Sequence, residues 1–210
     1  MPARHSDAMV IATYRQRAHT WDSNVKRATD RYDGPAHIQR LLSAQALPDG
    51  AVILDLGCGT GACGEFLSIG ASELIGVDLS PDMLERAAAK GSYSSLYEDE
   101  IERFLQGCGR QFDLVVAAGV LIMFSHLDSV LAAIAARLRP GGKLALTLYR
   151  AEQGEIEIRH NNHFGHSRGY LDRLFTDGGW QLLELVDVVH ETDGGQDQPG
   201  FSILLQRPEV

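Results

Sequence analysis

The segment Ala51-Val52-Ile53-Leu54-Asp55-Leu56-Gly57-Cys58-Gly59-Thr60-Gly61 decides the fold of this chain. Its first six residues are almost all apolar, which is typical of a strand buried on both faces of a parallel sheet. The glycines that follow let a ligand approach the backbone where a Cβ atom would block it, and the N-terminus of a following helix favours an anion. The segment therefore predicts a strand, a ligand-binding loop and a helix in succession.

Strands and helices continue to alternate on the C-terminal side of this segment. We expect strands at 74–78, 95–97, 112–118 and 143–149, and helices at 81–90 and 127–138. Ser80 should cap the first of these helices, with Pro81 in its first position. On the N-terminal side, apolar residues at helical spacing predict a helix that begins at Pro35. This alternation implies right-handed crossovers and a doubly wound α/β sheet.

The C-terminal end breaks the alternation. Residues 180–190 and 201–206 are strand-like, and the stretch between them is rich in Gly, Asp and Gln. Because no crossover helix fits into that stretch, the two strands should pair as an antiparallel hairpin.

The composition narrows the classes of function. Of 210 residues, 44% are apolar and 22% are charged, as in one soluble globular domain. The formal net charge of -9 and the lack of Lys/Arg runs argue against nucleic acid as a partner, because an acidic surface repels phosphates. The three cysteines, Cys58, Cys63 and Cys108, form no CxxC pair, so we expect neither a disulfide framework nor a zinc site. No apolar stretch suggests a leader or a membrane span, and we expect a cytoplasmic protein without a membrane partner.

Two cofactors fit the glycine loop. Gly57, Gly59 and Ala62 satisfy the dinucleotide fingerprint, and Asp78 follows at about the ~20-residue distance of a ribose-binding acid. An NAD(P)-dependent oxidoreductase is therefore one interpretation.

Four features favour S-adenosylmethionine over NAD(P). Asp55 lies at the strand end, where it can orient an ammonium group, whereas a pyrophosphate has no use for a carboxylate there. Asp78 ends the next predicted strand and can accept hydrogen bonds from both ribose hydroxyls. A wide turn expected over 138–144 and the terminal hairpin are the other two features.

Together these residues resemble the class I S-adenosylmethionine-dependent methyltransferases over residues 35–207. The resemblance implies a Rossmann-like, doubly wound, seven-stranded sheet whose last strand alone is antiparallel, with an N-terminal helical lid segment (1–34) and a methyltransferase domain (35–210). It assigns the methionine part to the glycine loop, the ribose to Asp78, and the adenine to apolar side chains and the acid Asp99 or Glu100. The positions expected at the cofactor are Asp55, Gly57, Cys58, Gly59, Asp78, Leu79, Met83, Asp99 and Ala118.

A narrower resemblance lies near the C-terminus. Residues 163–170, with Gly179-Trp180 and Pro199-Gly200-Phe201, look like methyltransferases that are often fused to tetratricopeptide repeats, and the Williams–Beuren-region methyltransferase-like proteins are similar. The substrates of that group are mostly undefined, so this resemblance implies no particular acceptor.

The methyl acceptor leaves fewer signals in the sequence. Ligands bind beyond the carboxyl ends of parallel strands, so Tyr149 and the residue after Ala118 should face the methyl group. That residue is Gly119, which cannot supply a base. His166 is the candidate for a base or a substrate contact, unless it merely caps the following helix; Tyr149 is the second candidate. We expect the stretch 150–167 to shape the acceptor site.

Histidines and aromatic residues provide the remaining candidates. His160, His163 and His166 lie close together but without a carboxylate, so no metal is expected, and His163 is a candidate substrate contact. Tyr14, Trp21 and Tyr32 are expected either to form a lid that excludes water or simply to pack as a hydrophobic staple.

The leading hypothesis is methyl transfer from S-adenosylmethionine to oxygen or nitrogen of a small polar molecule or a protein side chain. Holding the reactants in line can supply roughly 7–11 kcal/mol of the barrier. The alternatives are an NAD(P)-dependent oxidoreductase and a non-catalytic module that binds the cofactor without turnover.

Overall fold

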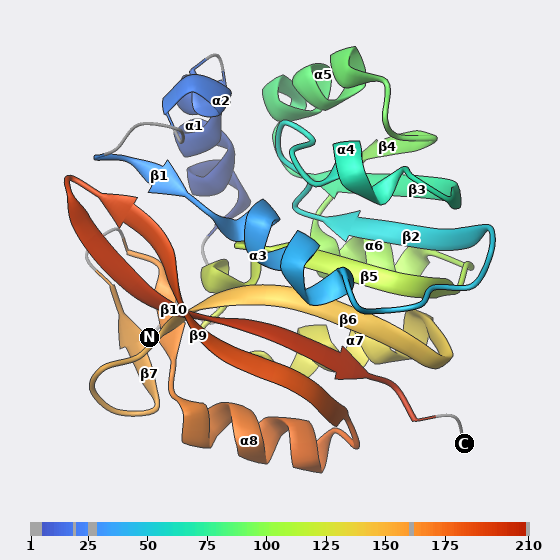
Figure 1. Ribbon diagram of the computed structural model, residues 1–210. Coiled ribbons are helices and arrows are strands. Elements are labelled where there is room, and N and C mark those ends of the chain that lie inside the picture. The colour runs from blue at the N-terminus through green and yellow to red at the C-terminus, as the bar shows by residue number, and fades with distance from the viewer. Residues whose placement is uncertain (1–5, 19, 25–28, 160–161, 209–210) are drawn as a thin grey trace.

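A ten-stranded mixed sheet with helices on both faces forms the centre of the computed structural model, which describes residues 6–18, 20–24, 29–159 and 162–208 (Figure 1). The strands are β1 (Arg31–Tyr32), β2 (Ala51–Leu56), β3 (Ala71–Asp78), β4 (Ser95–Glu98), β5 (Phe112–Ala118), β6 (Leu138–Arg150), β7 (Ile156–Ile158), β8 (Phe164–His166), β9 (Gln181–Asp193) and β10 (Gln196–Gln206). The helices are α1 (Asp7–Ala18), α2 (Trp21–Asn24), α3 (Gly34–Leu42), α4 (Gly64–Leu67), α5 (Pro81–Lys90), α6 (Ile101–Gly107), the 3₁₀ helix η1 (Leu121–Met123), α7 (Asp128–Arg137) and α8 (Arg168–Asp177). No described helix has the length and apolar character needed to span a membrane.

The strand order confirms the doubly wound prediction. Along the main path of the sheet the order is β1-β9-β10-β6-β5-β2-β3-β4. The central strands β6, β5, β2, β3 and β4 pair in parallel, and β10 pairs antiparallel with both β6 and β9. The seven strands expected from the sequence are therefore present, with the last one antiparallel.

Three strands were not expected. β1 pairs antiparallel with β9, which joins the predicted lid segment to the sheet. β7 and β8 lie within residues 150–167, which were expected to shape the acceptor site without strands of their own. β8 pairs in parallel with the end of β6 and antiparallel with β7. The prediction missed all three because each has only two or three residues, too few to show a period in the sequence.

The wide turn expected over 138–144 lies inside β6, as a bulge within the strand. β6 begins at Leu138, so helix α7 ends one residue earlier and the Pro140–Gly142 stretch continues the strand. The N–H of Gly141 donates to the carbonyl of Arg207, and the N–H of Arg207 donates to the carbonyl of Gly142. The segment is nevertheless bulged, because Gly141 has φ +73° and the register with β5 jumps from Phe112 opposite Leu138 to Leu114 opposite Lys143.

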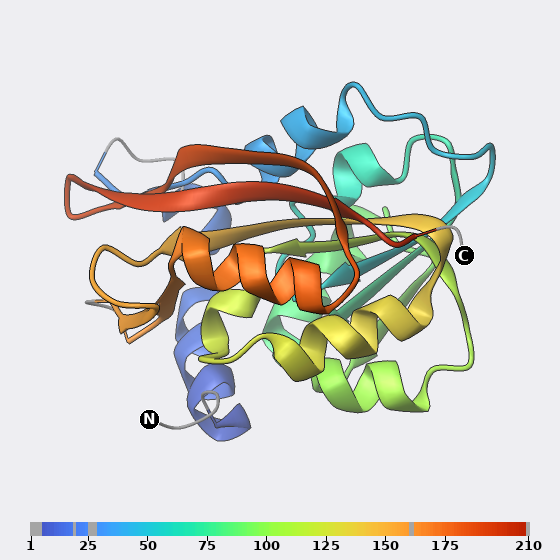
Figure 2. The same cartoon turned by 90° about the horizontal axis from the view of Figure 1, so that it is seen from below.

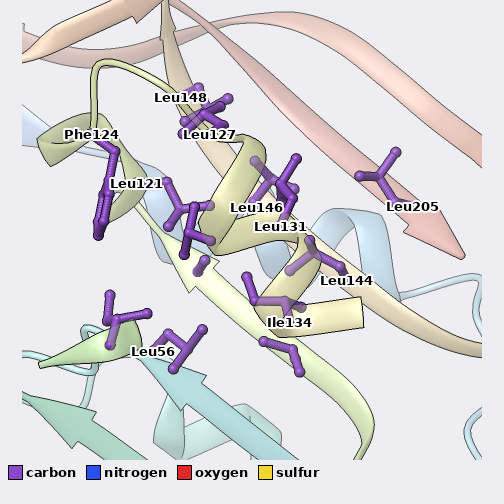
Figure 3. Close-up of a cluster of buried hydrophobic side chains, with 14 of the residues drawn as sticks. Leu56, Leu121, Phe124, Leu127, Leu131, Ile134, Leu144, Leu146, Leu148 and Leu205 are labelled. Carbon is purple, nitrogen blue, oxygen red and sulfur yellow. The ribbon is translucent and has the colours of Figure 1, made fainter. Parts of the chain in front are cut away.

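Alternate residues of the central strands feed two separate apolar layers. Ile53 of β2 packs with Ile38 and Leu41 of α3. Its neighbour Leu54 belongs to the larger cluster on the opposite face, beneath α6, α7 and α8 (Figure 2). In Figure 3, leucines of β6 and α7 interdigitate in this cluster, with Leu56 at its edge. The strands are thus buried on both faces, which holds their C-terminal ends rigidly side by side.

Candidate functional site

A cavity of about 380 Å³ lies where the predicted site residues converge. Its wall combines the loop after β2, the ends of β3 and β5, the start of α6, and parts of α1, α2, β1 and β9. The expected residues that line it are Tyr14, Trp21, Tyr32, Asp55, Gly57, Cys58, Gly59, Asp78, Leu79, Met83, Asp99, Ala118 and His163.

The glycine loop has the backbone conformation that its sequence predicts. Gly57 has φ +64° and Gly59 has φ +54°, in the left-handed region that other residues avoid. A Cβ atom on Gly57 would also overlap the side chain of Val120. The loop therefore needs glycine both for its conformation and for the close approach of Val120.

Asp55 is a buried carboxylate at the end of β2. It is 1% exposed and accepts a 2.7 Å hydrogen bond from the Tyr93 hydroxyl. Burial raises the pKa of Asp55 to about 7; the Tyr93 bond opposes the rise, and the nearby Asp78 adds to it. Because the negative charge is poorly solvated here, a ligand that brings a positive charge is favoured.

Asp78, at the end of β3, organises the loop from the other side. One carboxylate oxygen accepts a 2.9 Å hydrogen bond from the Gly59 N–H, and the other accepts a 2.8 Å bond from the Ser80 N–H. Burial raises the pKa of Asp78, although these backbone bonds oppose the shift. The sequence predicted a ribose-binding acid but did not reveal that the same carboxylate fixes the loop.

The acid at the end of β4 was left open between Asp99 and Glu100. Glu100 caps α6, since its two carboxylate oxygens accept bonds from the N–H groups of Glu102 and Arg103, at 3.1 and 2.9 Å. Asp99 also lines the cavity and forms an ion pair with the Arg103 side chain. The capping role of Glu100 makes Asp99 the better candidate to contact a ligand.

The N-terminal helices are fastened over this half of the cavity. The Thr60 hydroxyl of the glycine loop donates a 2.6 Å hydrogen bond to Asp22 of α2. Lys90 of α5 lies 3.2 Å from the other oxygen of Asp22, and Arg15 of α1 lies 3.3 Å from Asp82. Tyr14 and Trp21, whose ring centroids are 5.7 Å apart, are thereby held in the cavity wall.

The opposite half of the cavity contains residues that the sequence analysis missed. His190 and Glu191 come from β9, and Tyr32 of β1 pairs in register with Glu191. The Tyr32 and His190 ring centroids are 5.5 Å apart, and Nε2 of His190 lies 3.2 Å from the Thr147 hydroxyl oxygen. Burial lowers the pKa of His190 to about 3, so the ring is neutral near pH 7.

Comparisons with known proteins agree with this architecture. Residues 53–142 match a family model described as "Methyltransferase domain". A segment of 135 residues is 33% identical to the biotin biosynthesis bifunctional protein BioCD of Bordetella avium (strain 197N), covering 60% of this chain and 29% of that protein. The chain spans less than two thirds of the length of these curated relatives. The match covers 41% and 54% of the length of two other relatives.

Two solved structures share the fold over almost the whole chain. The N-methyltransferase NodS from Bradyrhizobium japonicum WM9, in complex with S-adenosyl-L-homocysteine, has a TM-score of 0.72 at 20% identity, covering 95% of this chain and 98% of NodS. The [4+2]-cyclase SpnF has a TM-score of 0.76 at 16% identity, covering 100% of this chain and 99% of SpnF.

Residues 53–142 thus resemble a methyltransferase domain, and the chain has the fold of class I methyltransferases. The expected Rossmann-like fold is confirmed, and the residues that match the family model begin within β2. The two glycines of the loop and the carboxylates Asp55 and Asp78 lie inside the matched residues. Tyr32 and His190 lie outside them.

Two side chains expected to be catalytic do not line the cavity of the methyltransferase domain. His166 is fully buried in β8, with Nε2 3.1 Å from the carbonyl oxygen of Ser125, and burial lowers its pKa to about 4. It also does not cap α8, because Ser167 does. Tyr149 is fully buried, and its hydroxyl donates to the carboxylate of Glu191. We therefore assign both residues to the packing behind the cavity wall.

Of the remaining histidines, His163 lines the cavity and stacks on Tyr149 with 5.9 Å between ring centroids. His160 lies outside the described residues. Within residues 6–18, 20–24, 29–159 and 162–208, no group of three or more His, Cys, Asp or Glu side chains has a geometry that could hold a metal ion.

Proposed function

We propose that the protein is an S-adenosylmethionine-dependent methyltransferase that acts on oxygen or nitrogen of a small polar molecule or a protein side chain. The observation that carries this proposal is the pair of carboxylates, the buried Asp55 and the partly buried Asp78, on either side of the glycine loop. A pyrophosphate at this loop would meet two negative charges, and the described residues of the loop itself provide no cation, whereas the ammonium of an amino-acid tail would neutralise Asp55. This difference favours S-adenosylmethionine over NAD(P).

The residues present fit each part of this cofactor. Asp55 would hold the ammonium, and Asp78 would accept hydrogen bonds from the ribose hydroxyls with the lone pairs that its two backbone bonds leave. Leu79 and Met83 would pack against the adenine, and Asp99 would accept a hydrogen bond from its amino group. When bound, the cofactor supplies a methyl group that its sulfonium already activates.

The chain itself would contribute alignment and exclusion of water. Tyr14 and Trp21, which α1 and α2 hold over the cavity, would cover the sulfonium. Closing such a site removes water and keeps the acceptor in line with the methyl group, and proximity alone can supply roughly 7–11 kcal/mol. The N-terminal segment 1–34 would thus act as a lid on the domain formed by 35–210.

The charge of the protein and of the cavity favours one class of methyl acceptor. The net charge of -9 and the acidic side chains of the cavity favour a small polar molecule or a protein side chain over nucleic acid. The place of the protein among the methyltransferases often fused to tetratricopeptide repeats, and its cytoplasmic location, are further proposals that rest on the sequence patterns alone.

Isothermal titration calorimetry tests the cofactor. We expect S-adenosylhomocysteine to bind and NADH not to bind. The Asp78→Ala variant should weaken S-adenosylhomocysteine binding by ~1–3 kcal/mol for each hydrogen-bonding partner left unpaired. Binding of NADH with no response to S-adenosylhomocysteine would establish the oxidoreductase alternative instead.

Methyl transfer requires a separate measurement, because SpnF shares the fold and is described as a cyclase. A cell extract incubated with methyl-labelled cofactor and the protein should yield a labelled product, detected by mass spectrometry. Cofactor binding without any labelled product would favour a non-catalytic module.

A further inference from the structure

The residue after β5 has no side chain, and the space it would use is filled from elsewhere. Gly119 has φ +64°, and a Cβ atom there would lie 2.5 Å from the hydroxyl oxygen of Tyr32. Gly34 likewise leaves room for the Tyr32 ring. Since ligands of parallel α/β sheets bind beyond the carboxyl ends of the central strands, Tyr32 occupies the position that faces a reacting ligand.

Two polar atoms in this half of the cavity lack partners. The Tyr32 hydroxyl oxygen is buried and makes no hydrogen bond of standard geometry within the described residues, although the Thr147 side chain lies near it. Nδ1 of His190 is also buried and without a hydrogen-bond partner among those residues, while Nε2 faces Thr147. Leaving a buried polar atom unpaired costs about 1–3 kcal/mol, which a ligand that bonds to it would recover.

The charges around these two atoms restrict the ligand. Asp30, Glu191 and Asp193 line the same region of the cavity. Arg31 is the one Lys or Arg among the described lining residues, and its guanidinium lies 2.6 Å from Asp33. An anionic ligand would therefore meet like charges without a free cation, whereas a neutral or cationic ligand would not.

We infer that Tyr32 and His190 form the acceptor subsite, where they hold an uncharged or cationic acceptor by the O–H or N–H group that receives the methyl. The inference rests on the proposed function. The neutral His190 ring, with its hydrogen on Nε2 toward Thr147, accepts the acceptor's hydrogen at Nδ1. The Tyr32 hydroxyl donates to an acceptor hydroxyl, which keeps its second lone pair for the methyl. With an amine, whose one lone pair must reach the methyl, the Tyr32 oxygen accepts an N–H hydrogen instead. This pair supplies the polar contact that Gly119 cannot.

The transfer step balances with these groups. As the acceptor atom forms its bond to the methyl carbon, the bond from that carbon to sulfur breaks and its electron pair stays on sulfur. The acceptor atom becomes positively charged, and an O–H group in that state is acidic enough to pass its proton to a weakly basic imidazole at Nδ1. An amine acceptor releases its proton in the same way or after the product leaves.

Fluorine NMR with two probes tests the subsite without requiring turnover. The probes are 4-fluorophenol, which is neutral with an O–H group, and 4-fluorobenzoate, which has the same ring but is an anion. With protein saturated by S-adenosylhomocysteine, we expect line broadening of 4-fluorophenol at millimolar concentration and none of 4-fluorobenzoate. Tyr32→Phe should weaken 4-fluorophenol binding at least tenfold. The control Tyr97→Phe, which alters a half-exposed ring of β4 outside the cavity, should leave it unchanged.

Each outcome separates the two hypotheses. Failure of the wild-type protein to bind S-adenosylhomocysteine overturns the proposed function. The acceptor subsite alone is overturned if S-adenosylhomocysteine binds normally and any one of three results is found. These are no binding of 4-fluorophenol, equal binding of both probes, or unchanged binding of 4-fluorophenol by Tyr32→Phe. Where the wild type labels a product in extract, Tyr32→Phe should lower the initial rate at least tenfold, because the acceptor loses one of the two contacts that align it, while the Kd for S-adenosylhomocysteine changes less than threefold.

Discussion

The two halves of the cavity are built in different ways. The half formed by the ends of β2, β3 and β4 takes its polar groups from positions next to strand ends, and Asp78 and the glycine loop hold one another through backbone hydrogen bonds. The half formed by β1, the end of β5 and β9 takes Tyr32 and His190 from segments far apart in the chain. The first half is thus a local motif, whereas the second depends on tertiary packing.

This difference explains what each half can recognise. The first half presents the buried Asp55, the partly buried Asp78 and a glycine-lined backbone, which suit one fixed ligand. The second half presents neutral hydroxyl and imidazole groups within an acidic rim, and its shape follows the docking of a two-residue strand on β9. One substitution in each half, with a matched control for each, tests whether the halves are as independent as this description requires.

Gly119→Ala should have the largest effect on folding stability. The new Cβ atom would overlap the Tyr32 hydroxyl and would also force an L-residue into a left-handed conformation. Overpacking typically costs 1–3 kcal/mol and the left-handed conformation roughly 1–2 kcal/mol, so we expect a loss of about 3 kcal/mol in the free energy of unfolding in urea.

Gly91→Ala is the matched control for this substitution. Gly91 has φ +68° at the end of α5, with no atom within 4 Å of the Cβ position among the described residues, so it should cost only the conformational part. In the double variant Gly119→Ala/Tyr32→Ala the overlap is absent, and the two single effects should not add. Additive effects would show that Tyr32 does not occupy the space above Gly119.

Asp55→Asn should weaken cofactor binding in the first half of the cavity, the cofactor half, and leave the second half around Tyr32 and His190, the acceptor half, intact. The amide can still accept the Tyr93 hydrogen bond but cannot neutralise an ammonium group. Hydrogen bonds to charged groups contribute about 1.5–3 kcal/mol, so calorimetry should show S-adenosylhomocysteine affinity reduced roughly 10–150-fold. Asp187→Asn, which alters a carboxylate paired with Arg150 outside the cavity, should leave the affinity unchanged.

The same variant should also change how the free energy of unfolding depends on pH. Burial raises the pKa of Asp55 from 3.8 to about 7, so between these values the folded protein holds a proton that the unfolded chain has released. This group therefore lowers the free energy of unfolding as pH rises from about 4 to 7, by at most about 1.4 kcal/mol per pH unit.

The two buried histidines act in the opposite direction. Burial lowers the pKa of His166 to about 4 and that of His190 to about 3, so below pH 6.5 the unfolded chain binds more protons and stability rises with pH. The difference between the urea profiles of the wild type and Asp55→Asn isolates the carboxylate. It should grow in favour of the variant between pH 4 and 7, and parallel profiles would contradict the raised pKa of Asp55.

Much of the fold and the cofactor half followed from the sequence. β2, β5 and α5 have the predicted bounds, because unbroken apolar runs, a Ser-Pro cap and glycine loops are local signals of strong physical preference. The carboxylates of the first half stand at strand ends, and a parallel sheet brings all such ends to one edge.

The acceptor half could not be predicted in the same way. His166 lies in a short histidine-bearing segment that resembles a surface loop, yet pairing of β8 with β6 buries it. His190 ends a strand-like run with no local feature to mark it, and only the pairing of β1 with β9 brings Tyr32 beside it. The glycine at position 119 was a signal of this arrangement, since an absent side chain leaves space for another.

The pairing of Arg31 and Tyr32 with Thr192 and Glu191 has a consequence for biosynthesis. During translation the cofactor loop can form as soon as β2, β3 and β5 have left the ribosome, but the strand that carries Tyr32 has no edge to dock on until β9 emerges. A nascent chain would therefore acquire cofactor affinity before it acquires the acceptor pocket. The acceptor pocket would form only after β9 has emerged, however early the nucleotide-like ligand of the glycine loop arrives.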